Sequence, residues 1–136
     1  MERCFDLARS VTAHLSSAAQ TQERVVSRVT SDLLGPGEEV TWEATHLGLR
    51  RRLTSRITRF DRPRSFEDEQ IAGPFGSFWH RHEFTHKDGL TVMTDLVRYH
   101  APFGALGWLV ERLVLDAYLL AFLERRAAHL RTLAEA

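Results

Sequence analysis

The spacing of hydrophobic positions changes twice along the chain and divides it into three stretches. In residues 2–19 apolar residues recur at helical spacing with interruptions, which predicts two short helices, the second capped by Ser10 or Thr12. From about residue 23 to residue 100 apolar and polar residues alternate, which predicts strands. In residues 105–134 the apolar spacing is three and four, which predicts one amphipathic helix of about eight turns.

The alternating stretch predicts about six antiparallel strands, separated by turn sequences such as "GPG", "DRPR" and "GPFG". The expected strands are residues 23–34, 38–47, 48–60, 65–72, 77–86 and 90–100. A curved sheet with one apolar face needs a cover, and only the last helix is long enough to supply it. We therefore expect an α+β fold in one domain over residues 1–136, with a space between sheet and helix where function is to be sought.

The segment "GSFWHRHEF" places two histidines between two aromatic residues on one face of a strand. The pair Asp88-Gly89 predicts a hairpin between this strand and the next. A two-residue turn sets His82 opposite Asp95, and a loop two residues longer sets His80 there instead. In both registers the candidate catalytic group His80, His82, Asp95 and Tyr99 shares the face expected to be concave.

Three interpretations of this group remain open, and we rank them from the most to the least favoured. In the first, the polar side chains satisfy one another and line a ligand cavity. In the second, Asp95 orients a histidine that acts as a general base. In the third, the histidines bind a metal. We expect no metal and no cofactor, because a zinc site needs a further well-placed ligand and His46 is the one other candidate nearby.

Apolar side chains on the same face of the sheet and on one stripe of the long helix predict the wall of the cavity. Leu109, Leu113 and Leu120 form the helix stripe, with Asp116 along it. The full set of expected ligand-binding residues is Val40, Trp42, Ala44, Leu53, Ile57, Phe66, Phe78, Phe84, Met93, Val97, Leu109, Leu113 and Leu120.

Composition and charge narrow the classes of function. Lys and Arg number 18, as do Asp and Glu, so the formal net charge of zero argues against a dedicated nucleic-acid-binding protein. We expect Arg50 and Arg52 of the "RRR" run to point outward into solvent, with Glu43 pairing one of them. No apolar run is long enough for a membrane span, no signal peptide is evident, and the one cysteine, Cys4, fits a reducing compartment, so we expect a cytoplasmic protein.

The chain resembles the bacterial SRPBCC proteins, the START-like helix-grip superfamily that includes pollen-allergen-like proteins, polyketide cyclase/dehydrases and coenzyme-Q-binding proteins. The similarity is carried by "FDLARSVTAHL", by residues 35–84, by "MTDLVRYHAPFGALGWLVERLVL" and by the closing "FLERRAAHLRTLAEA". Members of the superfamily usually have a strand before the first short helix, whereas this chain starts inside the turn that follows it. Either the start was assigned late or the strand is missing, and a missing strand would expose a sheet edge that favours self-association, such as a homodimer.

The resemblance implies a helix-grip fold, with the sheet wrapped around the C-terminal helix, and a small hydrophobic ligand such as a lipid, isoprenoid, polyketide or aromatic compound. A second hypothesis is a polyketide cyclase or dehydratase in which His80 or His82 moves a proton, Asp95 orients it and Tyr99 stabilises an enolate oxygen. A third is a protein-interaction module, whose sign would be a large exposed apolar patch.

Overall fold

The computed structural model describes residues 1–136, except for the side chains of residues 110–112. Two short helices, α1 (Glu2–Ala8) and α2 (Val11–Ser17), are followed by a single turn of 3-10 helix, η1 (Ala19–Thr21). Six strands come next, and the chain ends in a helical segment made of α3 (Gly104–Val110), η2 (Glu111–Leu115) and α4 (Asp116–Glu135). The expected α+β class, with short helices first and a long helix last, is confirmed.

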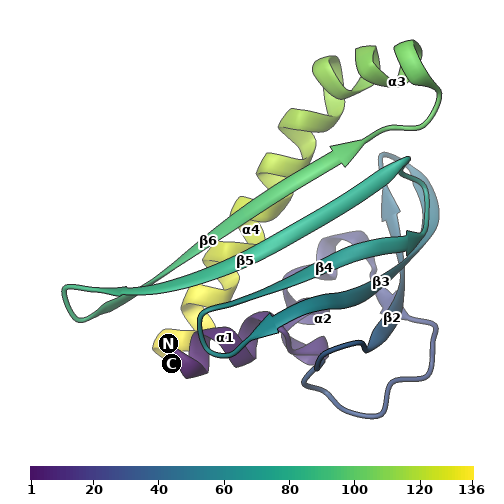
Figure 1. Ribbon diagram of the computed structural model, residues 1–136. Helices are drawn as coiled ribbons and strands as arrows, with labels where there is room; N and C mark the ends of the chain where they lie inside the picture. The colour runs from purple at the N-terminus through teal and green to yellow at the C-terminus, as the bar shows by residue number, and fades with distance from the viewer.

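The strands form one antiparallel sheet in which each strand pairs with its neighbours in sequence. They are β1 (Arg24–Val25), β2 (Glu39–His46), β3 (Leu49–Asp61), β4 (Ser65–Ala72), β5 (Ser77–Lys87) and β6 (Leu90–His100). The α4 helix runs diagonally across one side of the long β5–β6 hairpin, and the two chain termini lie side by side (Figure 1). Strand β6 has β5 as its one neighbour in the described sheet, so its other edge is unpaired.

The strand expected over residues 23–34 is wrong in extent, because only Arg24 and Val25 belong to the sheet. Beyond Val26, whose N–H still bonds the Thr41 carbonyl, the chain leaves the ladder. Side chains replace strand pairing there, because short polar residues bond nearby backbone groups. The Ser27 hydroxyl, for example, accepts a hydrogen bond from the Thr41 N–H at 2.9 Å.

Ser10 caps α2, as the sequence predicts: its hydroxyl accepts the Ala13 N–H at 3.1 Å. The same hydroxyl donates to Asp32 at 2.7 Å, and the Asp32 carboxylate also accepts the backbone N–H and the hydroxyl of Thr12. Asp32, in the irregular segment after β1, therefore holds the start of α2 in place.

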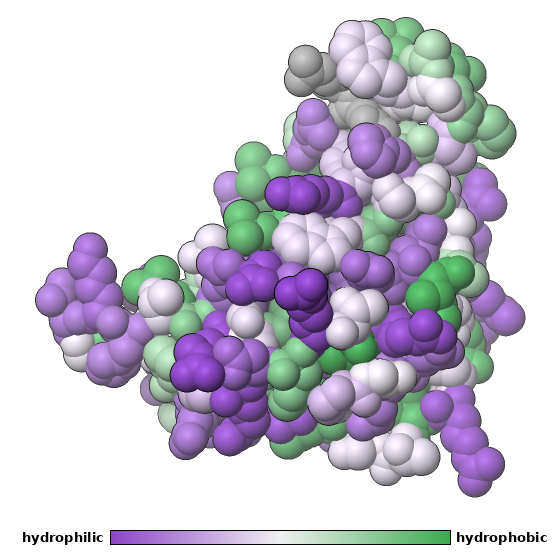
Figure 2. All heavy atoms as spheres, in the orientation of Figure 1, coloured by the Kyte–Doolittle hydropathy of each residue, from purple (hydrophilic) through white to green (hydrophobic). Residues whose placement is uncertain are grey.

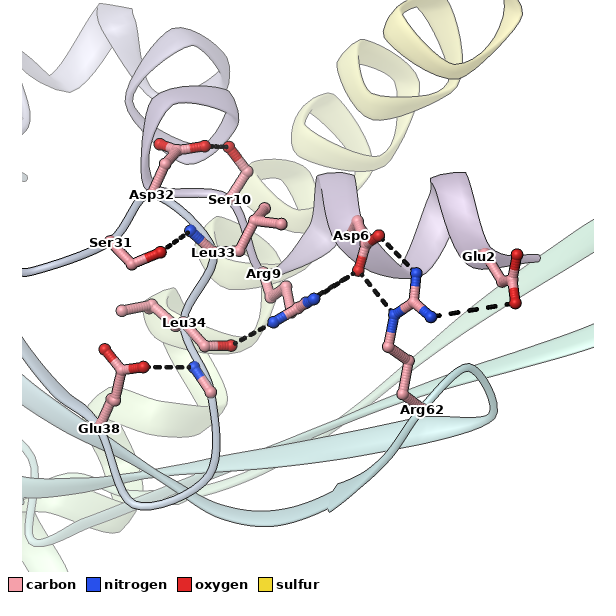
Figure 3. A network of polar contacts seen from close by, with 11 residues as sticks. Glu2, Asp6, Arg9, Ser10, Ser31, Asp32, Leu33, Leu34, Glu38 and Arg62 are labelled. Atoms are coloured by element: carbon pink, nitrogen blue, oxygen red, sulfur yellow. Dashed lines mark hydrogen bonds and ion pairs between the residues drawn. The ribbon is translucent and has the colours of Figure 1, made fainter.

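A network of ion pairs holds α1 against this segment and against the β3–β4 turn (Figure 3). Asp6 accepts hydrogen bonds from both Arg9 and Arg62, and Arg9 also donates to the Leu34 carbonyl at 3.2 Å. Figure 3 shows the carboxylate of Asp6 between the two guanidinium groups, which come from opposite sides of it. The short helices are thus anchored over one end of the sheet.

The C-terminal helical segment is long, as expected, but it is not one regular α-helix. The segment η2 has π-helical hydrogen bonding, with a wider turn than the α-helices on either side. A wider turn changes the angular position of all residues that follow it, so a stripe extrapolated from α3 does not continue along α4.

The hydrophobic core lies at the end of the sheet covered by α1. Phe5 is fully buried and packs edge-on against Phe60 and Phe66, with ring centroids 5.3 and 5.2 Å apart. Val40, Ile57, Phe84 and Leu130 complete the contact around it. The core therefore joins α1, the sheet and the last turns of α4, and it leaves the other half of the concave face free for a cavity.

The outer face of the sheet carries the arginine run. Glu43 is buried beneath Arg24, Arg50 and Arg52 and accepts hydrogen bonds from all three at 2.8 to 3.1 Å. The hydrogen bonds from Arg52 and Arg50 lower the pKa of Glu43 to about 2. The outward position of Arg50 and Arg52 is confirmed, and these charges are used in ion pairs within the sheet face.

Candidate functional site

A cavity of about 320 Å³ lies between the concave face of the sheet and α4. Its walls alternate with strand pleating, so even-numbered residues of β2, β4 and β5 and odd-numbered residues of β3 face it. The loop between β4 and β5 adds Pro74 and Phe75 at one end. Aromatic and aliphatic side chains make up most of the lining, as in sites for apolar small molecules.

The structure places most of the expected sheet residues in this wall. Trp42, Ala44, Leu53, Ile57, Phe66 and Phe78 line the cavity. Val40 and Phe84 lie instead in the core around Phe5, and Met93 packs against that core. Val97 pairs with His80 across the hairpin but is not part of the cavity wall.

The expected helix stripe does not face the cavity. Leu109, Leu113 and Leu120 are exposed, with 46, 71 and 59% of their surface accessible. Tyr118, Leu119, Phe122, Leu123 and Arg126 line the cavity in their place. The apolar spacing fits more than one face of this helix, and the wide turn at η2 moves the buried face away from the stripe extrapolated from residue 109.

The β5–β6 hairpin has the register set by a two-residue Asp88-Gly89 turn, with His82 opposite Asp95 and His80 opposite Val97. Both turn residues have a positive φ, 51° and 76°, as this tight turn requires. The alternative register with His80 opposite Asp95 is not found. Asp95 nevertheless reaches His80 along the diagonal.

Four titratable side chains form a cluster that we call the His–Asp cluster: Asp68, His80, His82 and Asp95. The first three line the cavity and Asp95 bonds His80 from β6; the histidines are buried and the aspartates are partly buried. His80 Nε2 lies 2.8 Å from Asp95 Oδ1, and His82 Nε2 lies 2.9 Å from Asp68 Oδ2. His82 Nδ1 is 3.3 Å from Asp95 Oδ1 but has no hydrogen bond of acceptable geometry. The imidazole of His82 is stacked between Phe66 and His80, with ring centroids 4.1 and 3.8 Å away.

Burial and charge fix the protonation of the His80–Asp95 pair. Burial and the neighbouring His82 lower the pKa of His80 to about 4, against the opposing hydrogen bond of Asp95. Burial would raise the pKa of Asp95, but the hydrogen bond from His80 and the adjacent His82 ring hold it well below its ordinary value. At neutral pH Asp95 is therefore ionised and His80 is neutral, which places the single ring proton of His80 on Nε2 and a lone pair on Nδ1.

Asp68 and Arg126 also belong to this polar end of the cavity, although neither is among the residues expected there from the sequence. Burial opposes ionisation of Asp68, but the hydrogen bond from His82 and the charges of His80, His82 and Arg126 keep its pKa below the ordinary value. The sequence gives one indication that Asp68 belongs to the cavity: it shares a strand face with Phe66. That face is compatible with a position in the cavity or in solvent. Arg126 has no such sign, because arginine on a helix is usually solvated.

Tyr99 is not brought into the cluster. Its hydroxyl donates to Asp116, at the start of α4, and the residue lies outside the cavity wall. His46, considered as a further metal ligand, bonds the Tyr118 hydroxyl through Nδ1 at 2.6 Å. Neither residue lies beside His80 and His82, where the sequence predicts it.

Asp68, His80 and His82 offer ligand atoms within 4.8 Å of one another, which is compatible with a metal ion in distance alone. The orientation of the rings is not suited to one. The two imidazoles are stacked with 29° between their planes, so an ion in the plane of both rings would require them to separate. Each Nε2 atom is also engaged with a carboxylate.

A second polar group lines the cavity between α2 and β2. His14 Nε2 lies 2.7 Å from Glu23 Oε1, and the His14 ring packs on Trp42 with centroids 4.2 Å apart. The His46–Tyr118 hydrogen bond joins β2 to α4 nearby. Because the members of these pairs already bond each other, they form part of the cavity wall but offer few free hydrogen-bonding groups to a ligand.

None of the helices in the described part of the chain combines the length and apolar character that crossing a bilayer requires.

Solved structures share this fold over nearly the whole chain. TTHA0849 from Thermus thermophilus aligns with a TM-score of 0.77 at 17% identity, covering 98% of this chain and 88% of that one. Ara h 8.0201 aligns with a TM-score of 0.61 at 15% identity, over 96% and 89% of the two chains. Ms6760 from Mycobacterium smegmatis gives 0.56 at 24% identity, over 82% and 67%.

No curated protein sequence shows a significant match to the chain. The family model described as "Polyketide cyclase / dehydrase and lipid transport" matches residues 12–123, which contain β1 to β6 and every residue of the His–Asp cluster. The helix-grip architecture of the solved structures agrees with that match. The chain therefore belongs to the polyketide cyclase / dehydrase and lipid transport family.

Proposed function

We propose that the protein binds a small, mostly apolar molecule in the cavity between the sheet and α4. The observation that carries this proposal is the cavity itself, about 320 Å³ with mostly aromatic and aliphatic walls and the His–Asp cluster at one place in them. Burying roughly 200 Å² of apolar ligand surface would contribute about 5 kcal/mol before the cost of association. The family to which the chain belongs includes lipid transport in its description, which supports the same class of ligand.

Native mass spectrometry of the purified protein tests this proposal, because a retained ligand appears as added mass on the intact chain. A matched pair of variants makes the test specific to the cavity. Ala44→Phe fills the wall of the cavity, whereas Ala117→Phe adds the same ring to an exposed position of α4. We expect the ligand to be lost in Ala44→Phe and kept in Ala117→Phe; equal retention in both would contradict the proposal.

A second candidate function is proton-transfer catalysis on a bound, polyketide-like substrate. The observation that favours it is the His80–Asp95 hydrogen bond, which leaves a lone pair on His80 Nδ1 in a residue of the cavity wall. In this role Asp95 orients His80, as a carboxylate does in many acid–base pairs. Because Tyr99 lies outside the wall, it has no part in this version of the mechanism.

The two functions differ in what a histidine substitution removes. In a catalytic protein, His80→Gln abolishes turnover and leaves ligand affinity within a few-fold of the original value. In a binding protein there is no turnover to lose, and His80→Gln changes affinity alone. Isothermal titration calorimetry of the ligand found by mass spectrometry, followed by product analysis of the same mixture, separates these results.

A further inference from the structure

Arg126 is a buried cationic side chain near the His–Asp cluster. It has 7% of its surface exposed and lines the cavity from α4. It shares the cavity wall with Asp68, His80 and His82, and its charge lowers the pKa of both Asp68 and His80. Among the described residues, however, no ion pair joins it to Asp68, Asp95 or any other acidic group.

The hydrogen bonding of this guanidinium is incomplete. Nη2 donates to the Ala8 carbonyl at the end of α1 at 3.0 Å, and Nε is buried without an acceptor. A guanidinium has five N–H groups, and a buried donor without a partner costs free energy. Nε itself is enclosed by protein atoms, but the guanidinium lines a mostly apolar cavity with more N–H donors than the Ala8 carbonyl accepts.

The charges around Arg126 limit which kind of ligand group would accept its remaining hydrogen bonds. Asp68 and Asp95 are ionised, so the His–Asp cluster and Arg126 together carry two negative charges and one positive charge when both histidines are neutral. The cavity lining also contains Arg9, which is paired with Asp6, Glu23, which is paired with His14, and Arg51. An anionic group brought into the cavity would add a third negative charge in a region of low dielectric constant. A cationic group would not accept the unmatched N–H at all, so a neutral acceptor is the remaining type.

We propose that Arg126 recognises the polar atom of the ligand, and that the cavity selects a neutral, mostly apolar molecule with a hydrogen-bond-accepting oxygen, such as a ketone. This inference rests on the proposed binding function and specifies its ligand class. The oxygen accepts from the guanidinium while the rest of the molecule contacts the aromatic walls formed by residues such as Trp42, Phe66 and Phe122. A fatty-acid carboxylate placed at Arg126 would meet the negative charges of Asp68 and Asp95 and is expected to bind more weakly.

Three naphthalenes substituted at the same ring position provide matched probes: acetylnaphthalene, isopropenylnaphthalene and naphthoate. The first is a neutral acceptor, the second is its apolar counterpart of nearly the same shape, and the third is an anion. Isothermal titration calorimetry gives their affinities for the full chain. We expect acetylnaphthalene to bind about tenfold more tightly than isopropenylnaphthalene, as for one hydrogen bond to a charged donor, and naphthoate to bind weakest.

The Arg126→Met variant removes the donors and keeps an apolar side chain of similar reach. It is expected to bind acetylnaphthalene and isopropenylnaphthalene equally, with the affinity for isopropenylnaphthalene kept. The ratio of the two affinities is the readout, because a loss of the Ala8 contact would weaken both probes together. Arg125→Met makes the same change at an exposed neighbouring position and keeps the tenfold ratio. If Arg126→Met does not fold, Arg126→Lys keeps the positive charge but removes the planar set of donors, and the ratio is expected to fall.

The outcomes separate this inference from the proposal on which it rests. Equal binding of the ketone and the alkene to the original protein overturns the role of Arg126 and leaves cavity binding in place. The same conclusion follows if the preference for the ketone survives in Arg126→Met, or if naphthoate binds most tightly. Absence of binding by all three probes overturns this inference, and the retention of ligand in the Ala44→Phe and Ala117→Phe variants then decides cavity binding separately.

Discussion

His80 hydrogen-bonds Asp95 at 2.8 Å, although the sheet register places Asp95 opposite His82 and diagonal to His80. A diagonal contact across a hairpin is within reach of a long side chain such as histidine. Asp95 therefore bonds one of two stacked imidazoles and lies 3.3 Å from the other, and Asp68 bonds His82 from the neighbouring strand β4. Each of these contacts has a measurable consequence.

Asp95→Asn is expected to lower the free energy of unfolding by about 2 kcal/mol, because it removes the ionised acceptor of a buried hydrogen bond. Urea denaturation followed by circular dichroism measures the change. Asp88→Asn makes the same substitution in the exposed hairpin turn, where asparagine also accepts a positive φ, and is expected to change stability by less than about 0.5 kcal/mol. Equal effects of the two substitutions would contradict the assignment of Asp95.

Stability is expected to fall as the pH is lowered from about 6.5 to about 4. The pKa of His80 is lowered from 6.5 to about 4 by burial, so in this window the unfolded chain binds more protons than the folded one. The free energy of unfolding therefore rises with pH across the window, by up to about 3 kcal/mol from this residue. Below it, protonation of Asp68 and Asp95, whose pKa values are also lowered, removes further stability.

The His80→Gln variant checks this pH dependence, because the glutamine amide keeps a donor for Asp95 but does not titrate. Thermal unfolding at a series of pH values should show a smaller slope between pH 6.5 and pH 4 than in the original protein. A slope that is unchanged by the substitution would show that His80 is not its source.

Ser10→Ala is expected to cost about 1 to 2 kcal/mol, since it removes the cap of α2 and one donor to Asp32. Urea denaturation again measures the effect. Ser16→Ala in the same helix is the matched control: it removes only an exposed hydrogen bond to His129 and is expected to cost less than about 0.5 kcal/mol. A cost at Ser16 equal to that at Ser10 would show that the cap is not the reason.

Self-association through β6 is expected at high protein concentration, because one edge of this eleven-residue strand is unpaired in the described sheet. The exposed apolar side chains that follow it extend the surface available to a second copy, and they include Phe103, Leu106 and Trp108. Figure 2 shows hydrophobic residues gathered at the end of the molecule that carries α3. Sedimentation velocity over a range of concentrations measures it. Val92→Lys on the exposed side of β6 should shift the protein toward monomer, and a distribution that does not depend on concentration would contradict the expectation.

The parts of the fold that follow from local chemistry could be predicted from the sequence. Asp88-Gly89 sets the hairpin register, because both residues adopt a positive φ in a two-residue turn. Alternation then places every residue of β5 and β6 on a definite face. Ser10, one of the two caps that the sequence offers, caps α2, whereas Thr12 lies inside the helix and bonds Asp32.

The parts that depend on contacts between distant segments could not. The face that α4 turns to the cavity depends on the wide turn at η2, and apolar residues on several sides of the helix leave the choice open. Asp68 joins His82 only because β4 pairs with β5 in a register that no short turn signal specifies. The burial of Arg126 depends on the position of the Ala8 carbonyl, more than a hundred residues away.

The β5–β6 hairpin extends well past the rest of the sheet, and its tip projects away from the helices (Figure 1). At this tip Leu90 is 69% exposed, whereas the cavity wall on β5 begins at the other end of the strand, with Phe78, His80 and His82. A fluorescent label attached at Leu90 would therefore report on the protein without touching its ligand or breaking the Asp88-Gly89 turn. The hairpin gives this chain a natural attachment point for a sensor.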